Sequence, residues 1–381
     1  MTDSNQKISC EVCGAEVHSI KKHLAEEHEG MSLEQYRADY PDAPIVSDYA
    51  KKLIMKRKQE QDKKMAAKET KKAFHEVFDI PSSTKGALNG RGKPIPITVL
   101  EDHDDEFART LVPEVDPNYI FTIDRLKEAM MGIDCSIPVC AFGMAGTGKS
   151  TLFEQICART NRPVLRVQHS GNTEESHILG QYLVKDGETY WEPGPLQICM
   201  KLGITYLADE YDRGMPQVLS VYQPVLEGKP LVTKEAPPEW RIIRPHPDFR
   251  FVATGNTNGA GDETGLFPST ALQDFANYER FGIMIEITWM PEAQEIAVIQ
   301  GQGGILEEDA RQLVRYANEV RKQVEAGSIS APISPRALIN AAQIGLRFQD
   351  YGRGLELCYI NRLGKSDAEV CKQVAQRYFG S

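Results

Sequence analysis

The sequence predicts an α/β fold, in which a mostly parallel β-sheet carries helices on both faces and is flanked by two smaller parts. Three observations lead to this prediction. From Asn118 onward, short apolar runs typical of strands alternate with helical segments, as in a parallel sheet covered by helices. After Pro291 the strand pattern ends and helical stretches follow. Near the N-terminus, a short polar segment carries cysteines and histidines.

Length and composition agree with a folded protein of several parts. The chain has 381 residues, enough for two or three domains at about 150 residues each. Its 41% hydrophobic and 26% charged residues exclude a disordered chain, a collagen-like fibre and a disulfide scaffold. No apolar run approaches the roughly 18 residues of a membrane-spanning helix, and the N-terminus lacks the apolar region of a signal peptide. We therefore expect a cytoplasmic protein that does not contact membranes.

The distribution of charge helps to divide the chain. Residues 1–72 carry 14 Lys and Arg against 13 Asp and Glu, whereas the remainder carries 30 against 41. Residues 49–75 contain 10 basic and 3 acidic residues without Gly or Pro, which predicts a basic helix, either a solvated spacer or a binding helix. Residues 80–118 are rich in Gly, Pro, Ser and Asp, which predicts a flexible connection with one short strand.

These patterns predict five parts and their elements. The parts are a Cys/His module (1–47), the basic helix (48–75), a linker and N-terminal extension of the next part (76–118), the α/β core (119–290) and a helical lid (291–381). A helix is expected to begin near Thr122 or Asp124. Strands are expected at 137–142, 164–167, 204–208, 249–254 and 283–288. Later helices are expected near 291–300, 307–326, 335–348 and 366–379.

The segment GMAGTGKST, residues 143–151, fits the P-loop pattern. It follows the apolar run at 137–142 and opens a helix, which is the context that such a loop needs. Glycines let backbone N–H groups turn toward phosphate oxygens, and the helix N-terminus adds a partial positive charge. We expect Lys149 to reach the β- and γ-phosphates of a nucleotide and Ser150 to hold Mg²⁺; the alternative is a glycine-rich turn without a ligand. The candidate nucleotide-binding residues of this loop are Gly143, Gly146, Gly148, Lys149, Ser150 and Thr151.

The second candidate element is ITYLADE, residues 204–210, an apolar run that ends in two carboxylates. We expect Asp209 to bind Mg²⁺ through water, and Glu210 to orient and polarise an attacking water. Adjacent carboxylates at the end of a buried strand are costly unless a cation offsets them. The alternative is an acidic turn after a strand.

Three further residues are candidates for catalysis. Asn256 follows the apolar run FVATG, and the carboxyl ends of parallel strands share one edge, so it could hydrogen-bond the γ-phosphate or the attacking water; a turn asparagine is the alternative. Arg280 lies just before the expected last strand, where it could also form a surface ion pair. Arg336 follows Ser334 and Pro335, which look like a helix N-cap and first helical residue. An arginine there opposes the helix dipole, which favours a bound anion nearby.

Long motifs in the same order resemble a known family. They are VPEVDPNYIF, GTGKST, ADEYDRG, IRPHPDFRFVATGNTNGAGDETGLF and NYERF, and EVFDI at 76–80 agrees with them. Over roughly residues 76–300 the chain resembles the ATPase subunit of aerobic cobaltochelatase, within the MoxR group of AAA+ ATPases. Segment 169–193 and the N-terminal addition depart from that subunit.

The resemblance implies a fold, roles for the residues and partners. It implies a P-loop AAA+ sheet with a helical lid that binds ATP and Mg²⁺ between the subunits of a ring, expected to be a hexamer. Lys149, Ser150 and Thr151 then correspond to Walker A, and Asp209 and Glu210 to Walker B. Asn256, Arg280 and Arg336 correspond to sensor 1, the trans-acting arginine finger and sensor 2. The implied partners are a protein with a von Willebrand A domain or a chelatase large subunit.

The N-terminal module carries a candidate metal site. Cys10, Cys13, His23 and His28 offer the thiolates and imidazoles that tetrahedral Zn²⁺ prefers; His18 is an alternative ligand, and a redox CxxC pair is the rival interpretation. The ligand spacing and the following GMSLEQYRADYPD resemble the prokaryotic Ros/MucR zinc finger, a DNA-binding family. Residues 10–39, however, contain 3 basic and 7 acidic residues, which suits phosphate binding poorly, although the expected helix at 49–75 is basic. Docking to a protein is therefore an alternative to DNA binding with at least equal support.

Two classes of function follow. The first is an ATP-hydrolysing AAA+ motor that remodels a protein or metal-chelatase partner recruited through the zinc finger. The second is a DNA-binding regulator in which the ATPase acts as a switch.

Overall fold

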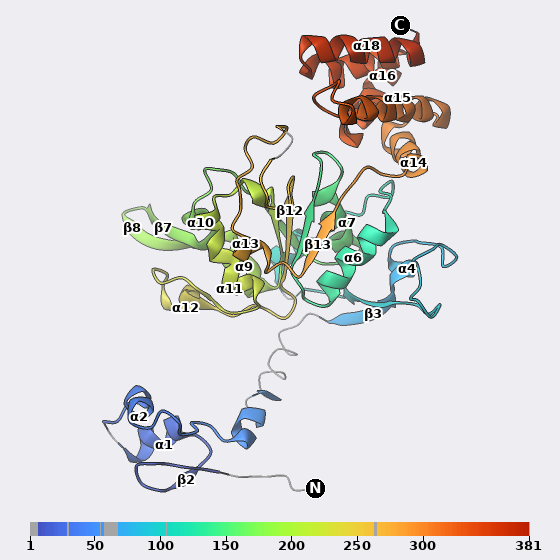
Figure 1. Cartoon of the computed structure of the whole chain (residues 1–381). Helices are drawn as coiled ribbons and strands as arrows, with labels where there is room; N and C mark the ends of the chain where they lie inside the picture. The colour runs from blue at the N-terminus through green and yellow to red at the C-terminus, as the bar shows by residue number, and fades with distance from the viewer. Residues whose placement is uncertain are drawn as a thin grey trace. The chain divides into compact units, whose positions relative to one another are not determined.

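The computed structural model describes residues 7–28, 30–53, 55–56, 68–103, 105–262 and 265–380. The chain forms two compact units, Met1–Ala66 and Ala67–Ser381 (Figure 1). In the part of the chain that is described, none of the helices is long and apolar enough to cross a bilayer.

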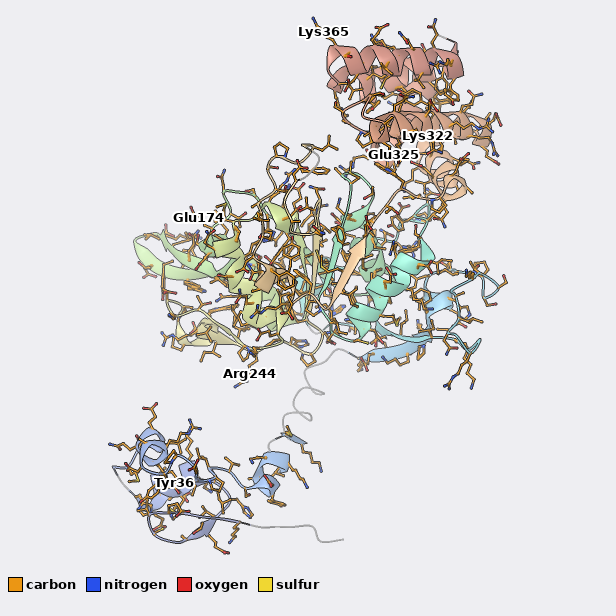
Figure 2. All side chains as sticks on the ribbon, in the orientation of Figure 1. Tyr36, Glu174, Arg244, Lys322, Glu325 and Lys365 are labelled. Atoms are coloured by element: carbon orange, nitrogen blue, oxygen red, sulfur yellow. The ribbon has the colours of Figure 1, made fainter. Side chains whose placement is uncertain are left out.

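The first unit is a small module built around four buried side chains. Strands β1 (Ile8–Ser9) and β2 (Glu16–Val17) pair antiparallel and precede helices α1 (Ile20–Glu27) and α2 (Leu33–Asp39). Ser19 and Ser32 cap the two helices with their side chains. The core consists of Cys10, Ile20, Leu24 and Tyr36, the last of which is labelled in Figure 2. So small an apolar core stabilises the module weakly, and small modules of this kind commonly depend on a structural metal or disulfides.

The predicted basic helix at 48–75 is wrong in its C-terminal part. Residues 48–53 and 55–56 are helical, and residues 54 and 57–67 lie outside the described residues. Residues Glu69–Ala73 form strand β3, which pairs antiparallel with β4 (Pro96–Leu100) from Glu69↔Leu100 to Ala73↔Pro96. Pairing with a strand more than 20 residues away overrides the helical composition of this lysine-rich segment.

The prediction that residues 80–118 form a flexible connection is also wrong. These residues belong to the second unit, where Ala87, Ile97, Leu100 and Ala108 are buried, and the expected short strand is present as β4. The short helix α4 (Phe74–Val77) comes just before residue 80, and α5 (Glu106–Thr110) lies within this segment. The Gly and Pro residues of this segment allow its turns, but they do not make it a flexible linker.

The centre of the second unit is a parallel sheet of five strands in the order β13-β5-β12-β9-β6. The strands are β5 (Val139–Phe142), β6 (Val164–Gln168), β9 (Thr205–Asp209), β12 (Arg250–Gly255) and β13 (Ile283–Glu286). They confirm the predicted strands within two residues. Every residue of β9 is buried, as expected for a central strand covered on both faces.

Helices cover both faces of this sheet, as predicted. Because side chains alternate along a strand, Leu207 packs with α6 (Ile123–Asp134) and α7 (Lys149–Arg159), whereas Tyr206 packs with α9 (Pro195–Leu202) on the opposite face. Figure 1 shows α6 and α7 on one side of the strands and α9 on the other.

Shorter elements surround the core. Segment 169–193 contains α8 (Glu175–Leu179) and an antiparallel hairpin of β7 (Gly180–Lys185) and β8 (Glu188–Pro193), which the sequence did not reveal. The others are α10 (Pro216–Leu219), α11 (Gln223–Leu226), β10 (Leu231–Val232), α12 (Pro238–Arg241), β11 (Ile242–Ile243) and α13 (Phe275–Tyr278).

After the last strand the chain is helical, as predicted. The helices are α14 (Glu292–Gly303), α15 (Glu307–Glu325), α16 (Pro335–Phe348), α17 (Tyr351–Cys358) and α18 (Lys365–Phe379), of which α17 was not expected. They share one apolar core that includes Leu313, Leu338 and Leu355, and Figure 1 shows them in orange and red, packed on one another.

Candidate functional site

The turn between β5 and α7 has the backbone of a phosphate-binding loop. Gly143, Gly146 and Gly148 have φ values of 142°, 78° and 88°, which L side chains rarely adopt. A Cβ at Gly143 would meet the Ile287 carbonyl oxygen at 2.2 Å, and one at Gly146 would meet Ser334 at 2.7 Å. In the described part of the chain, no atom lies within 4 Å of the same position at Gly148. The loop is therefore held closely on two sides and open at the helix N-terminus, where an anion could bind.

Lys149 is a buried cation surrounded by neutral acceptors. Its Nζ donates to the carbonyl oxygens of Gly143 (2.8 Å) and Met144 (2.9 Å), and to Asn256 Oδ1 (3.2 Å). Burial lowers the pKa of Lys149 to about 8, although nearby acidic groups, Asp212 foremost, oppose the shift. Oxygens of a bound phosphate would supply the full negative charge that this cation lacks.

Asp209, at the end of β9, accepts hydrogen bonds on both carboxylate oxygens. Oδ1 accepts from Ser150 Oγ (2.5 Å) and from Thr254 Oγ1, and Oδ2 accepts from Arg166 Nε (2.8 Å) and Nη2 (2.5 Å). Burial alone would raise the pKa of Asp209, but the hydrogen bonds from Ser150, Thr254 and Arg166 hold it below its usual value. Asp209 is thus a charged carboxylate beside a hydroxyl, an oxygen set that suits Mg²⁺.

Glu210 is held in a left-handed backbone conformation. Its φ is 52°, which is costly for a non-glycine residue and sets the direction of its side chain. Its Oε2 accepts from Gln168 Nε2 (2.7 Å) and Arg213 Nη1 (2.9 Å), and its N–H donates to Thr254 Oγ1 (3.1 Å). Among the hydrogen bonds of the described residues, none ends on Glu210 Oε1. That oxygen is available to accept a proton or a hydrogen bond.

Asn256 directly follows β12 and is fixed by a buried carboxylate. Asp212 Oδ2 accepts from the backbone N–H groups of Asn256 and Thr257, both at 2.8 Å. Asp212 is fully buried, and this burial raises its pKa although the hydrogen bonds act against it. Asp212 therefore fixes the loop that presents the Asn256 side chain to Lys149.

Arg336 lies near the phosphate-binding loop, as expected, and the predicted helix start is confirmed. Ser334 caps α16, and Pro335 is its first residue. Arg336 and Thr151 line a cavity of about 250 Å³ together with Gly146 and Gly148.

Arg280 does not join this cluster. Its Nε donates to Glu227 Oε1 at 2.7 Å, and its side chain is 25% exposed. The structure therefore brings together all the predicted nucleotide-site residues except Arg280, which forms an ion pair near the surface.

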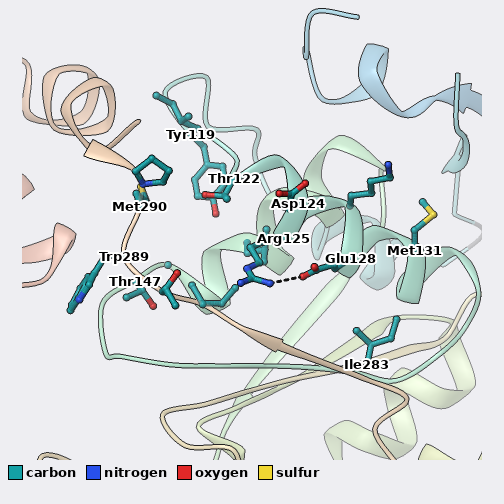
Figure 3. A pocket seen from close by; sticks show the side chains of 17 residues that line it. Tyr119, Thr122, Asp124, Arg125, Glu128, Met131, Thr147, Ile283, Trp289 and Met290 are labelled. Carbon is teal, nitrogen blue, oxygen red and sulfur yellow. Dashed lines mark hydrogen bonds and ion pairs between the residues drawn. The ribbon is translucent and has the colours of Figure 1, made fainter. Parts of the chain in front are cut away.

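A second cavity of about 780 Å³ lies beside the loop (Figure 3). It shares Tyr119, Ile120, Thr147, Gly148 and Met290 with the smaller cavity. Figure 3 also shows an ion pair on α6 between Arg125 and Glu128, in which Arg125 Nη1 lies 3.0 Å from Glu128 Oε2. The shared residues make this the larger of two recesses that meet the phosphate-binding loop, and its size is that of a small-molecule site.

Sequence reasoning missed several residues that shape the site. Arg166 and Gln168 lie on β6, and Asp212 and Arg213 follow β9. Asp212 could have been noticed, because ADEYDRG holds a third acid close to the strand end. Arg166 could not have been predicted from the sequence, because only the pairing register of β6 with β9 places it near Asp209.

The first unit contains the four predicted metal ligands in one cluster. One ligand atom from each of Cys10, Cys13, His23 and His28 lies within 4.8 Å of all the others. The Nε2 atom of His28 is buried and has no hydrogen-bond partner among the described residues, as expected for a nitrogen that coordinates a metal. His18, the alternative ligand, instead places its Nδ1 2.8 Å from Ser47 Oγ. This donor set fits tetrahedral Zn²⁺.

Two family models match successive stretches of the second unit. The family model of the AAA domain (dynein-related subfamily) matches residues 138–273, and that of the CbbQ/NirQ/NorQ C-terminal region matches residues 295–376. The aerobic cobaltochelatase subunit CobS of a Sinorhizobium species is 32% identical over 278 residues, which are 71% of this chain and 83% of CobS. Protein NorQ of Paracoccus denitrificans is 27% identical over 64% of this chain and 87% of NorQ. A mouse von Willebrand factor A domain-containing protein 8 is 25% identical over 60% of this chain and 12% of that protein.

Proposed function

Because the chain belongs to the family of AAA+ ATPases that includes the cobaltochelatase subunit CobS, and is therefore an ATP-hydrolysing enzyme, we propose that it is a ring-forming motor that remodels a partner protein recruited through its N-terminal module. The observation that supports ATP as the fuel of this motor is the convergence of Lys149, Ser150, Asp209 and Asn256 at one edge of the parallel sheet. Ligands of such sheets bind at this edge.

The loop and the neighbouring acidic residues would hold Mg²⁺ and the ATP phosphates. Backbone N–H groups of the loop from Gly143 to Gly148 would face the phosphates, with Lys149 as the charged partner. Ser150 and Asp209 would hold Mg²⁺, which neutralises charge on the phosphates when it is bound. The open space at Gly148 and the carbonyl-caged cation of Lys149 support this assignment.

Glu210 is the candidate base that orients the attacking water. Gln168 and Arg213 both bind its Oε2, which leaves Oε1 for a hydrogen bond from that water. Asn256, fixed through Asp212, would assist from the neighbouring strand end. The left-handed, strained backbone conformation of Glu210 thus helps to direct its carboxylate toward the attacking water.

The smaller cavity is the candidate site for the nucleoside. Its apolar residues Tyr119, Met290 and Ile339 suit a flat base, and Arg336 lies where it would approach the phosphates. Since both the α/β core and α16 line the cavity, binding would link the two. A change of nucleotide would then move the lid.

Arg280 is proposed to act on a neighbouring subunit. It lies outside its own chain's site and is held by Glu227. An arginine finger supplied in trans stabilises the transition-state charge of phosphoryl transfer. Arg280 in this role requires a ring, for which a hexamer is the expected size.

The N-terminal module is proposed to hold Zn²⁺ through Cys10, Cys13, His23 and His28, and to recruit the partner. Its acidic composition favours a protein over DNA. The proposed partner carries a von Willebrand A domain, since a relative of this ATPase is named for such a domain. DNA binding by the module would instead favour the regulator.

The proposal can be tested with the Glu210→Gln variant, which should retain ATP and hold the partner. A purified von Willebrand A-domain protein should bind this variant in the presence of ATP, and wild-type protein should release it after hydrolysis. Adding Cys13→Ser should abolish binding without changing ATP binding. Binding that is independent of both ATP and the module would contradict the proposal.

A further inference from the structure

Arg166 is hydrogen-bonded to Asp209, the carboxylate that is proposed to bind Mg²⁺. Arg166 lies on β6, which pairs with β9. In this pairing Arg166 lies opposite Leu207, and Gln168 lies opposite Asp209. Its guanidinium donates two N–H groups to Asp209 Oδ2, at 2.8 and 2.5 Å, while Ser150 and Thr254 donate to Oδ1. A carboxylate offers about four acceptor positions, and these four donors use them.

This arrangement leaves Asp209 no lone pair for a magnesium ion or for a water bound to one. The guanidinium and Mg²⁺ would also repel each other if both lay beside the same carboxylate. The two cations therefore compete for Asp209. One of them must leave when the other binds.

Arg166 is the partner that can move, and it has a second carboxylate within reach. Its side chain is 48% exposed, whereas that of Asp209 is 4% exposed. The Oε1 atom of Glu154, on α7, lies 3.5 Å from Arg166 Nη1. A small rotation of the guanidinium would strengthen its contact with Glu154 and release Asp209 Oδ2.

We propose that Arg166 neutralises Asp209 while the site is empty and transfers to Glu154 when Mg²⁺ and nucleotide bind. The proposal rests on the assignment of Asp209 to Mg²⁺ made above. In the empty state, Arg166 prevents the cost of a buried, unpaired carboxylate. Because Arg166 must leave Asp209 before Mg²⁺ can bind there, the strength of the Arg166–Asp209 contact lowers the affinity of the site for Mg²⁺.

The test is a Mg²⁺ titration of the full-length protein, read by binding of a fluorescent ATP analogue and by thermal melting. In Arg166→Gln, the Mg²⁺ concentration for half-maximal analogue binding should fall by about tenfold or more, because a charge-assisted hydrogen-bond pair no longer competes. Mg²⁺ without nucleotide should raise the melting temperature of this variant more than that of the wild type. Glu154→Gln removes the destination of Arg166, so it should raise the half-maximal Mg²⁺ concentration by a few-fold.

Two controls keep the result interpretable. Arg353→Gln removes an ion pair with Glu356 in the helical lid, where the arginine side chain is also 48% exposed, and should leave the Mg²⁺ titration unchanged. Arg166→Lys retains a charge with fewer donors and should lie between Arg166→Gln and wild type, which covers the case in which Arg166→Gln does not fold.

An unchanged or higher Mg²⁺ requirement in both Arg166 variants would overturn the proposal. That failure differs from a failure of the site itself. If Asp209→Asn leaves the Mg²⁺ dependence of analogue binding intact, the assignment of Asp209 to Mg²⁺ is wrong. If Asp209→Asn impairs it while the Arg166 variants do not change it, only the exchange is wrong.

Discussion

Lys149 Nζ donates a hydrogen bond to Asn256 Oδ1 at 3.2 Å and so joins the start of α7 to the end of β12, 107 residues apart in the sequence. The contact exists because β5, which leads into α7, pairs in parallel with β12 up to Phe142↔Gly255. Residues that follow these two strands must meet at one edge. The cation that would bind phosphate and the amide that would sense it therefore lie in direct contact.

The first prediction concerns the pH dependence of ATP binding. Burial lowers the pKa of Lys149 to about 8 in the nucleotide-free chain, and the charge of bound phosphates favours its protonated form. Below pH 8 the free protein already carries the proton. Above pH 8 the free protein has lost it and binding must take one up, so affinity should fall as the pH rises, by up to about tenfold per unit.

Calorimetry at pH 9 in two buffers of different ionisation enthalpy should detect this proton uptake. ATP is no source of the effect, because a phosphate with a pKa near 6 is fully ionised there. Equal affinities at pH 7.5 and 9.5, with no proton uptake, would show that Lys149 is charged throughout.

The second prediction concerns the ring. Arg280→Ala should assemble normally but hydrolyse ATP at least about a thousandfold more slowly, as expected for loss of an arginine finger. Mixed with Glu210→Gln, it should regain activity at interfaces that join an intact Glu210 to an intact Arg280. Steady-state hydrolysis of the mixtures measures this recovery.

Glu227→Gln serves as the matched control, because it removes the intrachain partner of Arg280 and leaves the arginine in place. It should retain turnover. Full activity of Arg280→Ala, or of monomers at low concentration, would argue against a site completed by a neighbour.

The third prediction concerns the metal. Zinc binding contributes on the order of 10 kcal/mol to folding in small zinc modules, so Cys13→Ser should release the metal and unfold residues 7–47 alone. Hydrogen exchange and metal analysis of the full chain would show this. Cys135→Ser, which replaces another exposed free cysteine, should do neither. A metal-free wild type, or loss of basal ATP hydrolysis in Cys13→Ser, would contradict the division of labour between the units.

The fourth prediction concerns the helical lid. Arg321 on α15 forms two 2.7 Å hydrogen bonds with Glu295 on α14, and both side chains are almost fully buried. The guanidinium also lies 4.2 Å from the centre of the Trp289 ring and donates to the carbonyl of Ile333. Arg321→Met leaves a buried, unpaired carboxylate and should destabilise the lid by about 3–5 kcal/mol.

Removing both charges should restore most of that loss. In the double variant Arg321→Met/Glu295→Leu no carboxylate is left unpaired, and apolar replacements of buried ion pairs are often neutral. Hydrogen exchange of α14–α16 measures both changes. A double variant as unstable as Arg321→Met would show that the geometry around Ile333, rather than charge, holds the lid.

Burial explains which parts of the fold could be predicted from the sequence. Strand β9 is buried throughout, so its apolar run identified it, and the same holds for most of β5 and β12. Hairpin β7–β8 has mostly exposed or half-buried residues, including Tyr182 and Val184, so no apolar run marked it. Strand β3 exposes its lysines and depends on partner residues that lie 23 or more positions away, which local composition cannot reveal.

The position of a residue relative to the strands also decides which site residues could be predicted from the sequence. Asp209 ends one apolar strand and Asn256 follows another, so their positions at one edge could be predicted from the sequence. Arg166 lies within a strand, and its approach to Asp209 depends on the neighbouring register. Neither the strand pattern nor the register places Arg280 in the site of its own chain, and only the family resemblance implies a role for it beside a neighbouring subunit's nucleotide.

The assignment of the ATPase site is tested most directly by comparing ATP binding and hydrolysis in wild type, Lys149→Ala and Glu210→Gln. Lys149→Ala should lose ATP binding, because the cation that faces the phosphates is gone. Glu210→Gln should bind ATP as wild type does but hydrolyse it at least about a hundredfold more slowly, since its side chain can no longer accept the proton of the attacking water. Wild-type turnover by Glu210→Gln would contradict the assignment of Glu210 as the catalytic base.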